Sequence, residues 1–516
     1  MLVNLQYMFR LFVALFCLQA LLLPSVANAK TTDEKIKPVL AKIHFSKDVI
    51  ARSKKLPKSI TKLLKKHKIP AKNISVYIRD LNEKTPLIEH NADKLRNPAS
   101  TMKLLTTYAG LKQLGPNFSW RTEVWLRGEL KNGVLNGDII LKGFGDPFLV
   151  MENFWKLLKG LRNKGLKEIN GDVIIDNSYF QQSQHNPSAF DGKPYRIYNA
   201  QSSALMFNFQ ATRFLFRPVI NDIKKVATKN KKKKPKGSVE IIPHPAINNF
   251  RFINKVKLTH GRCRESHYKP KFSKNKKGVL VIKGKYSSKC KQRFILRAVS
   301  SPEEHVFNAF RETWKDLNGS LKGQLKIGKV SKGDERFHVY SSPTLGEQIR
   351  LINKWSNNVM TRQLLLTLGA RQFGSPGTIE KGKRAVLAIL AENQIDTQGV
   401  RLENGSGLSR VAKISAKQMA DLLDRAYRDA YMPEFMASLS LPGVDGTLSK
   451  RFSRDALKGR AHLKTGTLDF VMAISGYMLN RNGKRLIVVI QHNGKRTGAG
   501  RGAKIQNALL RWSFEQ

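Results

Sequence analysis

Cysteine, acidic residues and long apolar runs are all scarce in this chain. Only three of its 516 residues are cysteines, and their spacing fits no zinc-binding pattern, so we expect no metal site. After the N-terminal segment no apolar stretch is long enough to cross a bilayer, which needs about 20 residues. No repeat of the solenoid type is present. The six Trp and 26 Phe need a core, so the composition is that of a folded protein with several domains.

The one long apolar run lies near the N-terminus and has the layout of a secretory signal. Arg10 precedes the apolar run 11–23, and Ala27-Asn28-Ala29 supplies the small-residue pattern of a cleavage site. We therefore expect residues 1–29 to be removed, so that the mature chain begins at Lys30. An uncleaved anchor is the alternative. The prediction is an exported protein that is soluble or loosely associated with a membrane.

Two cysteines remain once Cys17 leaves with the signal. Cys263 and Cys290 are an even pair in an oxidising compartment, where thiols pair. They flank the apolar stretch 278–282, which has the pattern of a strand, so we predict a disulfide between them across a small sheet. Two free buried thiols are the alternative.

The shortage of acidic residues leaves a formal net charge of +54, from 92 basic and 38 acidic residues. Nucleic acid is one partner for such a charge. The chain, however, carries an export signal, shows no nucleic-acid motif and spreads its lysines along its length, so no nucleic-acid partner is expected. An anionic wall or membrane surface fits an exported protein better. A generally basic, solvated surface is the plainest interpretation, and the lysine run 229–237 is interpreted as a solvated loop.

Strand and helix patterns divide the mature chain into a body and an insertion. Alternation predicts strands at 74–78, 471–479 and 485–491, and apolar spacing predicts helices from 343 onwards and at the C-terminus. Between these parts the pattern is rich in strands. The predicted organisation is α/β, with a body interrupted by a β-rich insertion. Its segments are a signal (1–29), the first part of the body (30–120), the insertion of one or two subdomains (121–339) and the second part of the body (340–516).

The first chemical motif is Ser100 followed by Lys103. Residues three apart share a helix face, so a hydroxyl and an amine would lie side by side at the start of an apolar helix. An amine among apolar groups loses hydration and its pKa falls, so a neutral Lys103 could take the proton of Ser100 and make it a nucleophile. Such a spacing is common in a lysine-rich chain, and alone it fits a serine that caps a helix.

Two further motifs follow in order. Ser356-Asn357-Asn358 precedes a helical run, and its hydroxyl and amide could both point into a cleft, although both residue types also cap helices. Lys464-Thr465-Gly466-Thr467 lies on a strand-like segment, where a cation and a hydroxyl could bind a carboxylate and glycine would allow close approach. An ordinary turn at a sheet edge is the alternative. Together the three form the signature of serine β-lactamases and penicillin-binding proteins.

With these motifs in place, the chain resembles the low-molecular-mass class C penicillin-binding proteins. These are the D-alanyl-D-alanine carboxypeptidase/endopeptidases similar to penicillin-binding protein 4. The resemblance spans most of the mature chain and also rests on the stretches 98–104, 143–147, 404–410 and 441–448. Two residues depart from the family pattern, because Asn357 and Asn404 both stand where the family often has Asp.

The resemblance implies a transpeptidase-like α/β (α+β) body with a five-stranded antiparallel sheet flanked by helices. It implies a periplasmic enzyme without cofactor or metal that acts on the stem peptides of peptidoglycan, and β-lactams would acylate its serine. The implied roles are a nucleophile (Ser100), its base (Lys103), a proton relay (Ser356), a substrate-amide ligand (Asn358), carboxylate ligands (Lys464, Thr465) and a close approach and oxyanion amide (Gly466, Thr467).

Two other functions fit parts of the same sequence. One is a β-lactamase or esterase on the same scaffold, which would differ in the rate of deacylation. The other is a non-catalytic basic protein that binds the cell wall.

Overall fold

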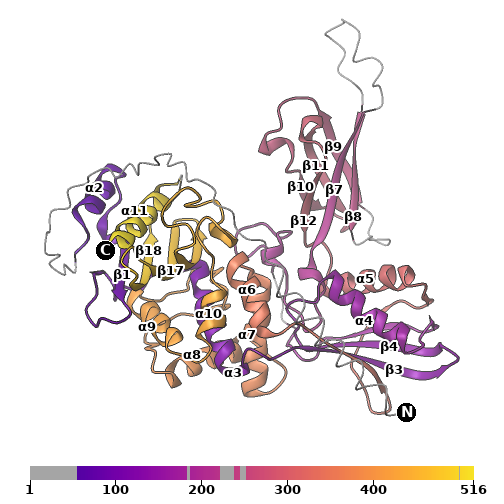
Figure 1. Cartoon of the computed structure of the whole chain (residues 1–516). Coiled ribbons are helices and arrows are strands. Elements are labelled where there is room, and N and C mark those ends of the chain that lie inside the picture. The colour runs from indigo at the N-terminus through magenta and orange to yellow at the C-terminus, as the bar shows by residue number, and fades with distance from the viewer. Residues whose placement is uncertain (1–54, 183–185, 221–236, 245–251, 499) are drawn as a thin grey trace, which may run out of the picture. The chain divides into compact units, whose positions relative to one another are not determined.

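The computed structural model describes residues 55–182, 186–220, 237–244, 252–498 and 500–516 (Figure 1). The predicted signal 1–29, the predicted start of the mature chain at Lys30 and most of the lysine run 229–237 lie outside these residues. No helix within the described ranges has both the length and the apolar character that a membrane span requires.

The central sheet of the body has five strands in the order β16-β17-β18-β1-β2. Every neighbouring pair is antiparallel, which confirms the sheet that the family resemblance implied. Strand β17 has the bounds that alternation predicted. The strands are β1 (Ile74–Asp80), β2 (Ile88–His90), β16 (Ala461–Leu468), β17 (Val471–Leu479) and β18 (Arg485–Asn493).

Both faces of this sheet are buried, which explains the nearly continuous apolar run of β18. Ile487 and Val489 point into a core shared with α3 (Lys103–Leu114) and α9 (Ala416–Tyr427). Val488 and Ile490 point into a second core, shared with helices α2 and α11. Figure 1 shows these two helices beside each other, α2 over Lys58–Lys66 and α11 over Arg501–Glu515. The sheet is therefore held between two layers of helices.

Two helices lie at the start of the part where apolar spacing predicted helices from residue 343 onwards. Helix α6 ends at Trp355, the next residue, Ser356, has a left-handed φ of 57°, and α7 begins at Asn358. The Asn357 Oδ1 accepts hydrogen bonds from the backbone amides of Val359 and Met360, so this side chain caps the start of α7. The helices α6 (Leu345–Trp355), α7 (Asn358–Phe373), α8 (Ile379–Glu392) and α10 (Met432–Ala437) all belong to this part.

Residues 121–341 include a seven-stranded mixed sheet. Its strands are β3 (Arg121–Lys131), β4 (Val134–Gly143), β5 (Glu168–Ile169), β6 (Val173–Asp176), β13 (Ser320–Leu321), β14 (Leu325–Ile327) and β15 (Glu335–Ser341). One face packs on α4 (Met151–Asn163) and α5 (Pro302–Asp316). The sequence patterns had not indicated α5, because this segment was interpreted as rich in strands.

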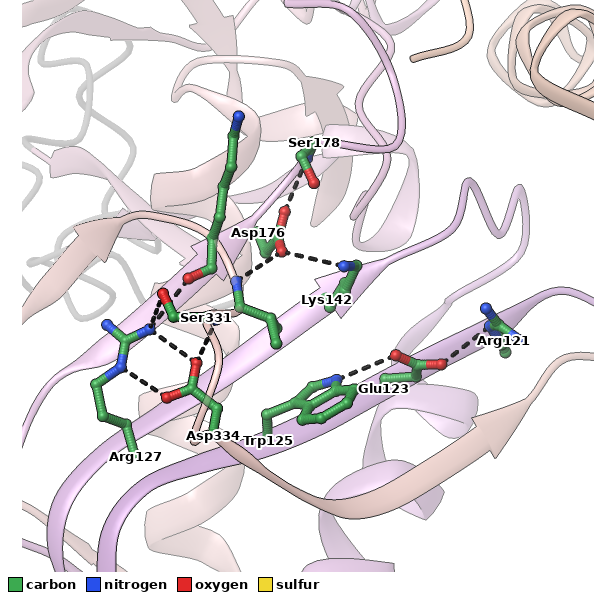
Figure 2. Close-up of polar contacts among 11 residues, drawn as sticks. Arg121, Glu123, Trp125, Arg127, Lys142, Asp176, Ser178, Ser331 and Asp334 are labelled. Atoms are coloured by element: carbon green, nitrogen blue, oxygen red, sulfur yellow. Dashed lines mark hydrogen bonds and ion pairs between the residues drawn. The ribbon is translucent and has the colours of Figure 1, made fainter. Parts of the chain in front are cut away.

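Charged side chains on this sheet are paired with one another. Figure 2 shows the ion pairs Arg127–Asp334 at 2.8 Å, Lys142–Asp176 at 3.6 Å and Arg121–Glu123 at 3.0 Å. The Trp125 ring nitrogen also donates to Glu123 at 3.0 Å. Arg121, Arg127 and Lys142 therefore each have a carboxylate partner close by.

The described residues between 212 and 297 form two three-stranded sheets that enclose an aromatic core. The first sheet has the order β12-β7-β8 and the second β10-β11-β9. Phe214, Phe216 and Tyr286 fill the space between them. The six strands are β7 (Thr212–Ile220), β8 (Gly237–His244), β9 (Phe252–Thr259), β10 (Lys271–Lys274), β11 (Leu280–Ser287) and β12 (Arg293–Arg297).

The predicted disulfide is present in this sandwich. Cys263 and Cys290 are bonded, with their Cα atoms 4.9 Å apart. The strand predicted at 278–282 begins later, at Leu280, and extends to Ser287. The predicted domain boundaries at 120/121 and 339/340 stay a prediction.

Candidate active site

Ser100 and Lys103 lie at the junction between a 3₁₀ turn, Ala99–Met102, and helix α3. The Lys103 ammonium group is fully buried and donates to three oxygens. These are the Ser100 Oγ at 3.2 Å, the Asn358 Oδ1 at 2.5 Å and the Ser406 carbonyl at 2.6 Å. The predicted hydroxyl–amine pair is therefore assembled, and the amine is held from three sides.

Burial is the main reason why the pKa of Lys103 falls well below its ordinary value. The neighbouring cations Lys464 and Arg362 lower it further. None of the three oxygens that Lys103 contacts is a carboxylate, so no negative charge in this shell offsets the cost of burying the ammonium form. The arrangement favours the neutral amine, which is the form that can accept the proton of Ser100.

The motif at Ser356-Asn357-Asn358 places two side chains beside this amine. Asn358 contacts Lys103 directly, and Ser356 accepts a hydrogen bond from the Lys464 Nζ at 2.9 Å. The left-handed backbone at Ser356 turns its hydroxyl away from the helix axis and towards β16. The middle residue, Asn357, caps α7 and makes no contact with either lysine. Its departure from the family pattern is therefore structural.

Lys464 is the second buried lysine of the site. It is fully buried on β16, and its Nζ also donates to the Thr465 carbonyl at 2.8 Å. Burial lowers its pKa to about 7. Lys464 thus connects the strand to the hydroxyl of Ser356, and the two lysines lie on either side of the two serines.

Gly466 allows β16 to lie directly against the nucleophile's turn. A Cβ at this position would be 2.6 Å from the Pro98 carbonyl oxygen and 2.9 Å from the Ser100 amide nitrogen, so any side chain would force the two apart. Gly407 has the same effect from another direction, because its φ is +74° and a Cβ there would be 1.8 Å from the Ala99 oxygen. The backbone around Ser100 is enclosed by two glycines.

Strand β16 presents some of its backbone amides on its free edge, which is the side away from β17. Leu463 exchanges two hydrogen bonds with Ser440 on the side away from β17. Backbone groups alternate along a strand, so Thr465 and Thr467 present their N–H and C=O groups on that same outer side. Because β16 is the edge strand of the sheet, these groups are available to an extended peptide.

Sequence reasoning missed two loops that support the motifs. In the loop 404–408, the Asn404 Oδ1 accepts from the Ser406 amide at 3.1 Å and hydroxyl at 2.8 Å, while its Nδ2 donates to the Leu408 carbonyl at 2.7 Å. This fixes the Ser406 carbonyl that accepts from Lys103. An aspartate could not donate to Leu408, which gives a reason for Asn404.

The second loop, 441–448, supports the third motif. Thr447 accepts from the Thr465 hydroxyl at 2.7 Å, and Asp445 pairs with Lys354 at 2.5 Å. Both stretches had carried the family resemblance, but no local pattern in the sequence indicated which of their residues contact the site.

A cleft of about 850 Å³ opens at these residues. From the motifs it is lined by Ser100, Ser356, Asn358 and Thr467, and from the insertion by Phe190, Asp191, Lys193 and Tyr198. Arg410 also lines it, stacked on Phe190 at 4.7 Å and paired with Asp469 at 3.0 Å. The insertion therefore forms part of the cleft wall, which the sequence alone did not reveal. Nowhere in the described ranges do three or more His, Cys, Asp or Glu residues gather in a way that could hold a metal ion.

A serine beside a dehydrated lysine, a second lysine on an edge strand and a cleft for an extended peptide define a serine acyl-transfer site. Residues 56–516 match the D-Ala-D-Ala carboxypeptidase 3 (S13) family, and the chain belongs to this family of serine-type carboxypeptidases. The predicted resemblance is thereby confirmed.

Named relatives agree with this assignment. The chain is 24% identical over 429 residues to D-alanyl-D-alanine carboxypeptidase DacB of Haemophilus influenzae, covering 83% of this chain and 86% of the relative. It is 27% identical over 418 residues to a D-alanyl-D-alanine carboxypeptidase of an Actinomadura species, covering 77% and 73%. The crystal structure of penicillin binding protein 4 (dacB) from Haemophilus influenzae has the same fold, with a TM-score of 0.73, 22% identity and coverage of 89% and 99%.

Proposed function

We propose that the protein is a serine D-alanyl-D-alanine carboxypeptidase and endopeptidase that acts on peptidoglycan stem peptides through an acyl-enzyme. The observation that carries the proposal is the position of the Lys103 amine, fully buried and 3.2 Å from the Ser100 hydroxyl. A depressed lysine pKa and a nucleophile within hydrogen-bonding distance are what such a reaction needs at neutral pH.

In the acylation step the Ser100 oxygen attacks the carbonyl carbon of the penultimate D-alanine as its proton passes to the neutral Lys103 amine. The carbonyl oxygen becomes an oxyanion, which the backbone amides of Ser100 and Thr467 stabilise. The outward direction of the Thr467 amide and the close approach at Gly466 support this assignment.

The tetrahedral intermediate then collapses as the peptide C–N bond breaks. The proton that Lys103 accepted passes to the leaving amine through the Ser356 hydroxyl, so that both groups regain their starting protonation, and the Lys464 ammonium lies beside this hydroxyl at 2.9 Å. Asn358 binds the substrate amide, and Lys464 with Thr465 binds the terminal carboxylate of the leaving D-alanine. Water then hydrolyses the ester on Ser100 and restores the enzyme.

The same geometry accounts for both proposed substrates. A stem peptide ending in D-Ala-D-Ala has a free carboxylate for Lys464, and a D-alanyl cross-link has the same bond in a longer chain that can leave along the open edge of β16. Penicillin presents a strained amide and a carboxylate in a similar arrangement, so we propose that it acylates Ser100. The penicillin binding protein 4 of Haemophilus influenzae has been solved with a β-lactam bound.

The proposal places the enzyme outside the cytoplasm, in the periplasm. We also propose that the catalytic body is built from residues 30–120 and 340–516 and that residues 121–339 form its accessory insertion. No nucleic acid or cofactor is required by this chemistry.

The test is release of D-alanine from a synthetic stem peptide and cleavage of a cross-linked dimer by the mature protein. We expect both activities in the natural chain and neither in Ser100→Ala. If the fold is intact and the natural chain releases no D-alanine while turning over penicillin steadily, a β-lactamase is favoured. If it does neither, the function is binding and the proposal is wrong.

A further inference from the structure

Positive charge is concentrated in one part of the molecule. Residues 212–297 contain 26 basic and three acidic residues, a net charge of +23 out of +54 for the whole chain. The described residues of this segment form the two-sheet sandwich.

Strand register arranges the lysines of the β10-β11-β9 sheet in rows. Lys283 of β11 is directly opposite Lys271 of β10 on one side and Lys255 of β9 on the other. In the next row Lys285 is opposite Lys257. Paired residues in neighbouring strands point to the same face, so all five ammonium groups lie on one face, on strands about 4.8 Å apart. We call this set of five the lysine face.

The lysine face is the outer face of the sandwich. All five lysines are exposed, whereas the alternate residues of the same strands, among them Ile282 and Leu280, are buried in the aromatic core. Two lysines directly opposite each other repel, and three in a row repel more. Five lysines in register therefore repel one another in the free protein.

No carboxylate among the described residues forms an ion pair with any lysine of the face. The two carboxylates of the sandwich that lie within the described ranges are engaged elsewhere, Glu240 with Arg217 and Glu265 with Lys269. The seven-stranded sheet differs, since its Arg121, Arg127 and Lys142 each have a carboxylate partner (Figure 2). The unpaired charge is therefore a property of this face and not of every sheet in the protein.

Apolar side chains share the face with the lysines. The row next to Lys271, Lys283 and Lys255 consists of Ser273, Val281 and Ile253, and the Ile253 side chain is 39% exposed. A sheet face with cations in rows beside an exposed isoleucine and a half-buried valine matches the headgroup layer of an anionic bilayer, where lysines meet lipid phosphates and aliphatic groups reach the acyl boundary. A linear polyanion needs the charges but has no use for these two aliphatic side chains.

We propose that the lysine face binds the surface of a membrane that contains anionic phospholipids. The binding is electrostatic in the main, so it weakens as salt shortens the screening length to about 8 Å at physiological ionic strength. It does not depend on the proposed function, because no residue of the face lines the catalytic cleft. Its consequence for the enzyme would be to keep a soluble catalytic body at a membrane surface.

The experiment is co-sedimentation of the mature protein with vesicles of phosphatidylcholine mixed with phosphatidylglycerol, compared with vesicles of phosphatidylcholine alone. The test variant replaces the five lysines of the face with glutamine. The control variant removes the same charge from other exposed positions on α2 and α4, through K62Q, K65Q, K66Q, K156Q and K159Q. Thermal unfolding and penicillin acylation of all three proteins verify that each is folded.

We expect the natural chain to bind the anionic vesicles and not the neutral ones. The lysine-face variant should bind at least about 100-fold more weakly, because each lysine near an anionic surface contributes close to a factor of five. The control should lose much less. The proposal is overturned if the natural chain ignores the vesicles, if both variants lose binding equally, or if the natural chain binds only a soluble polyanion such as heparin.

Discussion

Lysine does two different things in this protein, and the difference between the catalytic cleft and the lysine face shows why. In the cleft, Lys103 and Lys464 are fully buried, and burial lowers the pKa of each. On the sandwich, Lys255, Lys271 and Lys283 are exposed and lie in a single row across three strands. The pKa of Lys464 falls to about 7 and that of Lys103 lies well below its ordinary value, whereas the row remains exposed to solvent.

A buried lysine has a lowered pKa and can take part in proton transfer, but it is charged less of the time. An exposed lysine stays charged and does not take part in proton transfer. The cleft needs few lysines because each acts on one atom, Lys103 on the Ser100 hydroxyl and Lys464 beside Ser356. The sandwich needs many because each contributes little by itself. Substitutions of the buried and of the exposed lysines test this difference directly.

Loss of the buried base should have the largest effect. Lys103→Ala removes the group that accepts the Ser100 proton, so acylation by penicillin should slow by about 10³-fold, within the range of general-base catalysis. The lysine-face variant should acylate at the natural rate. Stopped-flow or quenched-mass measurements of acylation check both. An Ala variant that acylates normally would show that the base lies elsewhere.

Lys464 should have the next largest effect, and it should depend on pH. The neutral form of Lys103 is needed, so kcat/KM rises with pH through its depressed pKa, whereas the cationic form of Lys464 is needed, so kcat/KM falls as pH passes about 7. Lys464→Ala should lower kcat/KM for a peptide with a free carboxylate by about 10- to 100-fold, the value of a charged hydrogen bond.

The conservative variant separates charge from shape. In Lys464→Arg the charge persists at every pH tested, so the falling limb near neutrality should disappear even if the maximum is lower. The measurement is a pH profile of kcat/KM for D-alanine release. A falling limb that stays in place in Lys464→Arg would assign it to another group.

A smaller effect is expected at Asn404, the residue that holds the Ser406 carbonyl. Asn404→Asp replaces the donor to Leu408 and brings a negative charge towards the site, which should raise the pKa of Lys103. The rising limb of the acylation profile should move to higher pH, with a loss of a few fold on its acid side. Asn404→Ser, which brings no charge, serves as the control, and equal profiles for both variants would contradict the electrostatic explanation.

Asp146 extends the comparison to a buried acid, with an effect on stability but not on acylation. Burial raises its pKa to about 7, although its Oδ1 accepts a hydrogen bond from the Phe148 amide. The unfolded carboxyl ionises at lower pH than the folded one, so the stability that it contributes is present in acid and is lost as pH rises towards 7.

Asp146→Asn should remove this loss, because the amide does not ionise and its oxygen can still accept from the Phe148 amide. The gain in unfolding free energy over the natural chain should grow from near zero at about pH 4 to roughly 2–4 kcal/mol above neutrality. Chemical unfolding at several pH values measures it. A gain that is the same at every pH would mean that Asp146 is not protonated in the fold.

Local patterns predicted the parts of the site that local sequence determines. Ser100 and Lys103 are one turn apart, so their proximity follows from helical spacing alone. Strand β17 and the disulfide followed from alternation and from cysteine number. The contact between Lys103 and Ser406 did not, because the two residues are 303 positions apart and only the folded chain brings them together.

The lysine face was unpredictable for the same reason. Each of its strands reads as an ordinary exposed pattern, and the row Lys271–Lys283–Lys255 exists only through the register of three strands, one pair of them parallel. The insertion's contribution to the cleft, through Phe190 and Tyr198, likewise depends on tertiary structure. Helix α5 was missed because the surrounding segment was assigned as β-rich.

The proposed mechanism requires that Ser100, activated by a dehydrated lysine, forms a covalent acyl-enzyme. Its most direct test is the intact mass of the mature protein after exposure to benzylpenicillin, with peptide mapping of any adduct and Ser100→Ala as the control. We expect one stable adduct, located on the peptide that contains Ser100 and absent from the variant. An adduct on a different residue, or no adduct on a folded protein that leaves penicillin intact, would contradict it.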